Sequence, residues 1–139
     1  MDLYCPPLVS HQFALKLVAK ATDLALKEHL AVVSCVLDTT GRVKAKLAMD
    51  GVPLIAETLV EQKANTALLS ISSGDFGEAV EANAAHRESF SSLDDITLLS
   101  GGFPLFKEGQ LVGAFAVAGA LPEQDAEIAQ CAMQALKEE

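Results

Sequence analysis

The side chains that could bind a metal ion are few and widely spaced. The three histidines are His11, His29 and His86, and no two are four residues apart, so one helix face cannot present two imidazoles to a metal. His29 and His86 fall near the ends of expected helices, where the helix dipole favours a positive side chain. The sequence identifies no metal, and His11 and His29 remain secondary candidates for a metal ligand.

Nucleophilic side chains show no catalytic arrangement either. Cys5, Cys35 and Cys131 are odd in number, have no CxxC pairing and are best interpreted as reduced thiols. The sequence contains no GxSxG segment, no phosphate-binding loop of P-loop length and no dinucleotide-binding fingerprint after a strand. No catalytic residue is therefore assigned, and a non-catalytic protein is favoured over an enzyme.

Two features could instead form a binding site. The adjacent glycines Gly101 and Gly102 would let the main chain approach a ligand closely, or could only form a tight turn or bulge that leads into a strand. Lys63 lies in the middle of an expected helix, one position before an inward-facing alanine. Its ammonium could bind a ligand carboxylate, extend to solvent, or pair with Glu57 or Glu61. Spacing alone does not choose among these alternatives.

Composition limits the class of protein. The 139 residues fit one domain, expected over 10–139 after an N-terminal arm at 1–9, and 50% of them are hydrophobic. A net charge of -9, no tryptophan and one tyrosine argue against a nucleic-acid partner, because phosphate would be repelled and few aromatics could stack on bases. No apolar stretch approaches the ~20 residues of a membrane helix and no targeting segment is visible. We therefore expect no membrane partner and a cytoplasmic location.

The first half of the chain predicts a helix, a hairpin and two more helices. Ser10 can cap the first helix, Gly41 suits the hairpin turn, and Asp75 is a plausible N-cap for the third helix. The expected elements, in order, are a helix over 10–29, strands over 31–37 and 43–49, and helices over 54–70 and 76–87. The inward residues expected in the second helix are Ile55, Leu59, Ala64, Ala67 and Leu68.

The second half predicts another hairpin and a final helix. Pro122 suits a first helical position, and acidic residues follow it, as the helix dipole prefers. The expected elements are the apolar runs 96–99 and 103–106 on either side of the glycine pair, a buried strand over 111–119 and a helix over 122–137. Short connections favour antiparallel neighbours. The fold class is therefore α+β, with an antiparallel sheet of about five strands flanked by helices.

Several short motifs together resemble the GlcG/HbpS family, and their order and spacing hold from about Ser10 to Leu136. They are Asp38-x-x-Gly41, Met49-Asp50-Gly51, Lys63-Ala64-x-x-Ala67, Gly101-Gly102-Phe103-Pro104, Val112-Gly113-Ala114 and Gly119-x-x-Pro122-Glu123-Gln124-Asp125. One segment departs from the pattern. Family members usually read Gly-Val-Ser-Gly-Gly-Thr where this chain has residues 116–121, so the usual threonine N-cap before Pro122 is replaced by Leu121.

The resemblance implies a profilin-like fold, assembly into a symmetric homo-oligomer and a small-molecule ligand such as haem or a corrinoid. The family includes haem-binding sensors, the C-terminal domain of PduO-type corrinoid adenosyltransferases, and small proteins linked to glycolate, propanediol or glycerol utilisation, which this chain most resembles. The residues expected to shape the pocket are Lys63, Gly101, Gly102, Phe103 and Gly119.

The leading hypothesis is a small oligomeric binding protein for haem, a corrinoid or a related ligand. One alternative is an enzyme or accessory factor that acts on a small hydroxy-acid or diol-derived metabolite, with Lys63 holding its carboxylate. Another is a pure assembly scaffold.

Overall fold

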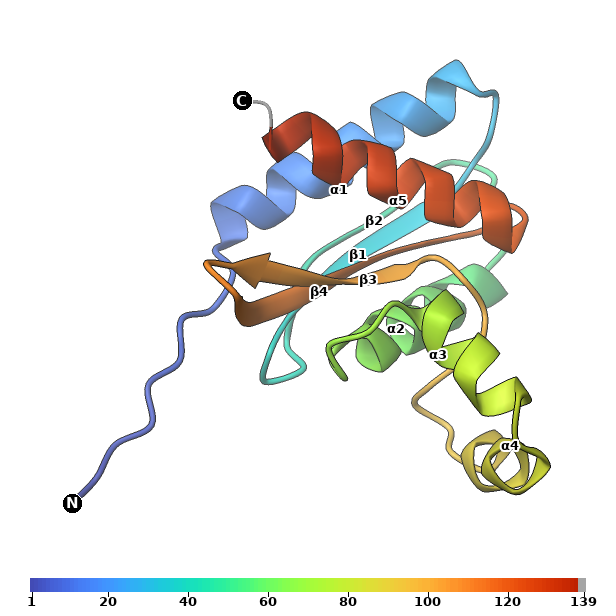
Figure 1. Cartoon of the computed structure of the whole chain (residues 1–139). Helices are drawn as coiled ribbons and strands as arrows, with labels where there is room; N and C mark the ends of the chain where they lie inside the picture. Colours follow the sequence, from blue (N-terminus) through green and yellow to red (C-terminus); the bar gives the residue numbers. More distant parts are fainter. Residues whose placement is uncertain (138–139) are drawn as a thin grey trace.

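The computed structural model describes residues 1–137, and within this range five α-helices flank one four-stranded antiparallel sheet (Figure 1). The elements are α1 (His11–Lys27), β1 (Val33–Asp38), β2 (Val43–Ala48), α2 (Ile55–Ala67), α3 (Ser73–Glu81), α4 (Ala84–Ser91), β3 (Gly102–Lys107), β4 (Gln110–Ala118) and α5 (Pro122–Lys137). The α+β class is confirmed. The last two residues of the domain expected over 10–139 lie outside the described residues.

The sheet has the strand order β2-β1-β4-β3, and each neighbouring pair is antiparallel. Both expected hairpins form, and β1 is central with all six residues buried. About five strands were expected, but the run 96–99 is not a strand. Its Thr97 instead bonds to α2: the Thr97 N–H donates to the Thr66 hydroxyl at 3.0 Å, and that hydroxyl lies 3.2 Å from the Thr97 carbonyl oxygen.

The helices form a layer on each face of the sheet (Figure 1). Because strand side chains alternate between faces, β1 and β4 supply two separate cores. One core places Val36 and Phe115 against α1 and α5, and the other places Cys35 and Ala116 against α2. Helices α1 and α5 therefore pack on one face of the sheet and α2 packs on the other.

Helix boundaries follow the capping side chains. Ser10 caps α1 as expected, accepting from the Phe13 N–H at 3.1 Å. The single helix expected over 76–87 is wrong, because the Asn83 side chain divides this segment, and the first helix begins earlier, at Ser73. Ser72, not Asp75, caps α3, and Asn83 starts α4 by accepting from the N–H groups of residues 85 and 86. His86 consequently lies in the first turn of a helix and not near its end.

The N-terminal arm leaves the body of the molecule as an extended chain (Figure 1). The Val9 N–H donates to the Val112 carbonyl oxygen at 2.9 Å, so the arm joins the body beside the start of β4. Before that point Met1, Leu3 and Tyr4 are exposed. No helix within the described part of the chain is both long enough and apolar enough to cross a membrane.

Candidate functional site

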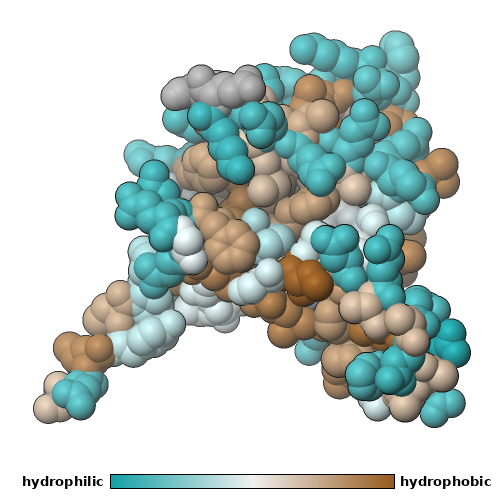
Figure 2. All heavy atoms as spheres, in the orientation of Figure 1, coloured by the Kyte–Doolittle hydropathy of each residue, from teal (hydrophilic) through white to brown (hydrophobic). Residues whose placement is uncertain are grey.

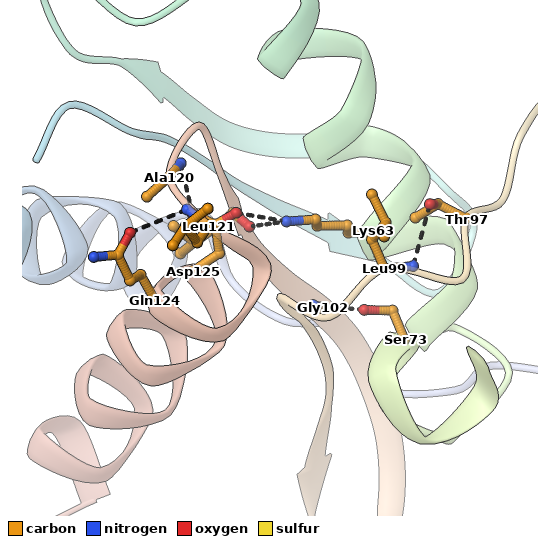
Figure 3. Close-up of polar contacts among 10 residues, drawn as sticks. Lys63, Ser73, Thr97, Leu99, Gly102, Ala120, Leu121, Gln124 and Asp125 are labelled. Carbon is orange, nitrogen blue, oxygen red and sulfur yellow. Dashed lines mark hydrogen bonds and ion pairs between the residues drawn. The ribbon is translucent and has the colours of Figure 1, made fainter. Parts of the chain in front are cut away.

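A buried ion pair connects the two helical layers. Lys63 on α2 is 0% exposed, and its Nζ lies 2.7 Å from Oδ2 of Asp125 on α5, which is 1% exposed (Figure 3). The same ammonium donates to the Val117 carbonyl oxygen of β4 at 3.0 Å. Two of its three N–H groups therefore have acceptors from the chain itself.

The helical period of α2 carries Lys63 inward. The buried residues Ala56, Val60, Lys63 and Ala67 are four, three and four positions apart, which is one face of a helix. The expected inward residue Ile55 is instead exposed. The two neighbouring glutamates that could have paired with Lys63 pair with Lys46 of β2, which lies 2.9 Å from Glu61 and 3.9 Å from Glu57.

Asp125 also closes the turn before α5. Its Oδ1 accepts from the Ala120 N–H at 3.0 Å, while its Oδ2 binds Lys63 (Figure 3). The Leu121 N–H donates to Gln124 Oε1 at 3.1 Å, so side chains from inside the helix satisfy N–H groups at its start. These bonds fix the turn that leads into α5, where Leu121 takes the place of the usual threonine.

The two glycines make room for this lysine. Gly101 has φ 135°, and a Cβ there would lie 2.5 Å from the Val117 carbonyl oxygen and 2.8 Å from Lys63 Nζ. A Cβ on Gly102 would collide with the Lys63 carbonyl oxygen. The Gly102 N–H donates to Ser73 Oγ at 2.9 Å. Gly101, Gly102 and Lys63, three of the expected pocket residues, thus lie together in a packed polar junction.

Burial controls the electrostatics of this junction. Burial lowers the pKa of Lys63, and although the hydrogen bond and charge of Asp125 raise it, the pKa remains below its ordinary value. Because Lys63 is 0% exposed, a ligand carboxylate could not reach this ammonium without moving the groups packed around it. The arrangement can therefore join α2 to α5, and it presents no charge to solvent.

The remaining expected site residues lie elsewhere. Phe103 is on the α5 side of the sheet and lines a hollow of about 390 Å³ with Cys131 and Met133. Gly119 has φ 120°, and a Cβ there would lie 2.8 Å from Val52 Cγ2. The structure therefore does not bring Phe103 together with the lysine junction.

The two candidate metal ligands are well separated. His11 begins α1 and His29 follows its C-cap, and the 17 residues of this helix span about 25 Å. Among residues 1–137 no group of three or more His, Cys, Asp or Glu side chains is arranged to hold a metal ion. Burial, followed by the charge of Glu61, raises the pKa of Cys35 to about 12, so its thiol stays protonated at neutral pH.

An open groove of about 760 Å³ lies between the arm, the start of α1, the β3–β4 hairpin and the end of α5. In Figure 2 apolar side chains lie exposed between the hydrophilic surface of α5 and the hairpin. We call this site the α1–α5 groove. Its lining residues are Pro7, Leu8, Val9, Ser10, Phe13, Pro104, Leu105, Phe106, Lys107, Glu108, Val112, Met133, Leu136 and Lys137.

Sequence reasoning missed this groove, because its walls come from four segments that only the fold brings together. Asp125 was also missed as a partner of Lys63, although the four-three-four spacing of α2 placed a lysine among apolar residues. Within the described part of the chain, the groove has two lysines and one glutamate on otherwise mostly apolar walls. Apolar clefts of roughly 300–1,000 Å³ with a few polar groups are typical of small-molecule sites.

The molecule is thus an α+β domain with a filled polar junction and an open apolar groove. A family model described as haem degrading protein HbpS-like matches residues 9–134, and the chain belongs to this family. Protein GlcG of Escherichia coli is 32% identical over 110 residues, which is 79% of this chain and 81% of GlcG.

Solved structures agree with this assignment. A crystal structure of HbpS matches with a TM-score of 0.87 over 97% of this chain and 94% of HbpS, and at 22% identity it supports the fold alone. The structure of PduOC in complex with haem matches with a TM-score of 0.85 and 25% identity, over 92% of this chain and 94% of PduOC.

Proposed function

We propose that this protein binds haem or a closely related tetrapyrrole in the α1–α5 groove. The observation that carries the proposal is the groove itself, which is large, open and mostly apolar in a chain whose family and structural relatives include haem proteins. The packed junction around Lys63 offers no comparable space. Even a single Cβ added to Gly101 or Gly102 would collide with neighbouring atoms.

The residues of the groove fit this group. Haem is a flat apolar ring with two carboxylates on one edge, so it needs apolar walls and cations at the rim. Phe13, Phe106 and Met133 would contact the ring, and Lys107 and Lys137 would meet the carboxylates. When bound, haem would supply a redox-active iron, and Met133 would be among the residues that hold the group, offering it a thioether sulfur.

Titration with ferric haem tests the proposal. We expect a saturable change in the haem absorbance band at about one haem per chain, and no such saturation in a Val112→Trp variant whose side chain fills the groove. Leu15→Trp is the matched control, because Leu15 is exposed on α1 outside the groove. Parallel titration with cobalamin determines whether a corrinoid binds. No saturable change with any tetrapyrrole would favour the alternatives, an enzyme for a hydroxy-acid or diol-derived metabolite or a scaffold.

We also propose that the protein forms a homo-oligomer. Large apolar side chains are exposed at the start of α2 and in the turn before α5, namely Leu54, Ile55 and Leu121. Exposed apolar side chains of this size are often covered by a partner subunit. Light scattering should give a mass several times 14.6 kDa. A monomeric mass at micromolar concentration would contradict this.

A further inference from the structure

We propose that Lys107 and Lys137 form a carboxylate clamp, so that the α1–α5 groove selects a flat aromatic ligand by its two carboxylates and not by its metal. This inference rests on the haem proposal and specifies how the ligand is recognised. It adds that a metal-free porphyrin dicarboxylate should bind, and that the same ring without free carboxylates should bind less tightly.

The two lysines are available for a ligand. Both side chains are exposed, and among residues 1–137 neither has an acidic group within ion-pair distance. They reach the groove from different elements, Lys107 from the end of β3 and Lys137 from the end of α5. A ligand with two carboxylates on one edge could therefore meet one cation from each wall.

The charge of the groove differs from that of the whole chain. The sequence has 19 acidic and 10 basic residues, whereas the lining of the groove within residues 1–137 has two lysines and one acid, Glu108. Among the described lining residues, an anion repelled by most of this acidic surface would meet two lysines and one acid here. The rim therefore favours an anionic ligand over a neutral one.

The walls favour a flat ring between these charges. Phe13 of α1 is 37% exposed and Phe106 of β3 is 51% exposed, so part of each ring is open to the groove. Two partly exposed aromatic rings from separate elements can stack on or pack edge-on to a planar ligand. Apolar contact and carboxylate pairing are thus supplied by different residues and can be separated by mutation.

The experiment compares three ligands added from the same co-solvent: ferric haem, protoporphyrin IX and protoporphyrin IX dimethyl ester. For the parent protein we expect protoporphyrin IX to bind about as tightly as haem, and the dimethyl ester to bind roughly tenfold more weakly. Added salt should weaken binding of the dicarboxylates more than binding of the ester.

The variants identify the residues. A Lys107→Gln/Lys137→Gln protein should lose roughly tenfold affinity for both dicarboxylates and little for the ester. A Lys16→Gln/Lys44→Gln protein, changed outside the groove, should bind like the parent. Circular dichroism and the melting temperature establish that each variant is folded.

The outcomes separate this inference from the haem proposal. If the parent binds haem but the ester binds equally well, or the groove variant keeps full affinity for the dicarboxylates, the clamp is wrong and haem binding stands. If the parent binds none of the three ligands saturably, the haem proposal itself has failed. If haem binds but metal-free protoporphyrin IX does not, the clamp is also wrong, because recognition would then depend on the metal.

Discussion

The lysines of the junction and of the groove show how environment decides the role of one side-chain type. Lys63 has no solvent contact and is bound by Asp125 and the Val117 carbonyl oxygen. Lys107 and Lys137 are exposed beside apolar walls. A buried ammonium without partners would be very costly, so its partners belong to the fold. The two groove lysines are solvated and need no partner for stability, which leaves them free for a ligand.

The largest effect should come from breaking the buried pair. Lys63→Ala leaves the Asp125 carboxylate buried and unpaired, so we expect the free energy of unfolding to fall by about 3–5 kcal/mol at pH 7, measured with urea.

A double variant is the control for the buried pair. Lys63→Met/Asp125→Leu removes both charges and should recover much of the stability lost by Lys63→Ala. If Lys63→Ala unfolded like the parent protein, the pair would contribute nothing to the connection between α2 and α5, and the contrast with the groove lysines would disappear.

A smaller loss is expected from filling the space beside Lys63. Gly102→Ala places a methyl group against the Lys63 carbonyl oxygen, so the backbone must shift, and we expect a loss of about 2–3 kcal/mol. The cause is steric, because Gly102 does not have the positive φ of Gly101. Gly41→Ala is the matched control: it has φ 85° but open space, and should lose only about 1 kcal/mol from backbone strain. If Gly102→Ala and Gly41→Ala lost the same free energy of unfolding, the packing around Lys63 would be loose.

The buried thiol of Cys35 should make the stability of the protein depend on pH. Its folded pKa is raised from 9.0 to about 12, so above pH 9 the unfolded thiol ionises and the folded one does not. The unfolded state then binds fewer protons, and stability falls as pH rises. From pH 8 to pH 10 the parent should lose about 1 kcal/mol more than Cys35→Ala. Identical pH profiles would show that the thiol is not desolvated.

The three thiols should also differ in reactivity. In the folded protein Cys5 and Cys131, which are exposed, should react with thiol reagents faster than Cys35.

The smallest effect on stability should come from the groove lysines. Lys107→Ala and Lys137→Ala should each change the free energy of unfolding by no more than about 0.5 kcal/mol, because both side chains are solvated. Thermal melting against the parent measures this. A loss comparable to that of Lys63→Ala would make these lysines structural and remove the contrast between the two regions.

The sequence predicted the elements best where local signals agree. Ser10 at the start of α1, the continuous apolar run of β1 and Pro122 at the start of α5 each act within a few residues, and the structure has these elements. Local signals were misread where polar side chains compete. Asn83 divides the segment between α3 and α4, and Thr66 holds the run 96–99 away from the sheet.

Tertiary contacts could not be predicted from spacing in the same way. Lys63 and Asp125 are 62 residues apart. Spacing left the partner of Lys63 open, and Asp125 was interpreted only as an acid in the first turn of the last helix. The α1–α5 groove combines Pro7–Ser10 with the β3–β4 hairpin and the end of α5, and no periodicity in the sequence relates these segments. Motif resemblance identified the family, but it pointed to the glycine–lysine junction and not to the open groove.

The bond between Lys63 and Asp125 also has a consequence for how the molecule opens. It joins helices on opposite faces of the sheet and passes Gly101, next to the start of β3. Neither face can release its helix without exposing one member of a desolvated pair. The amide hydrogens of α2 and α5 should therefore exchange with solvent at similar rates, as parts of one cooperative unit. Those of α4, which has no buried residues, should exchange much earlier.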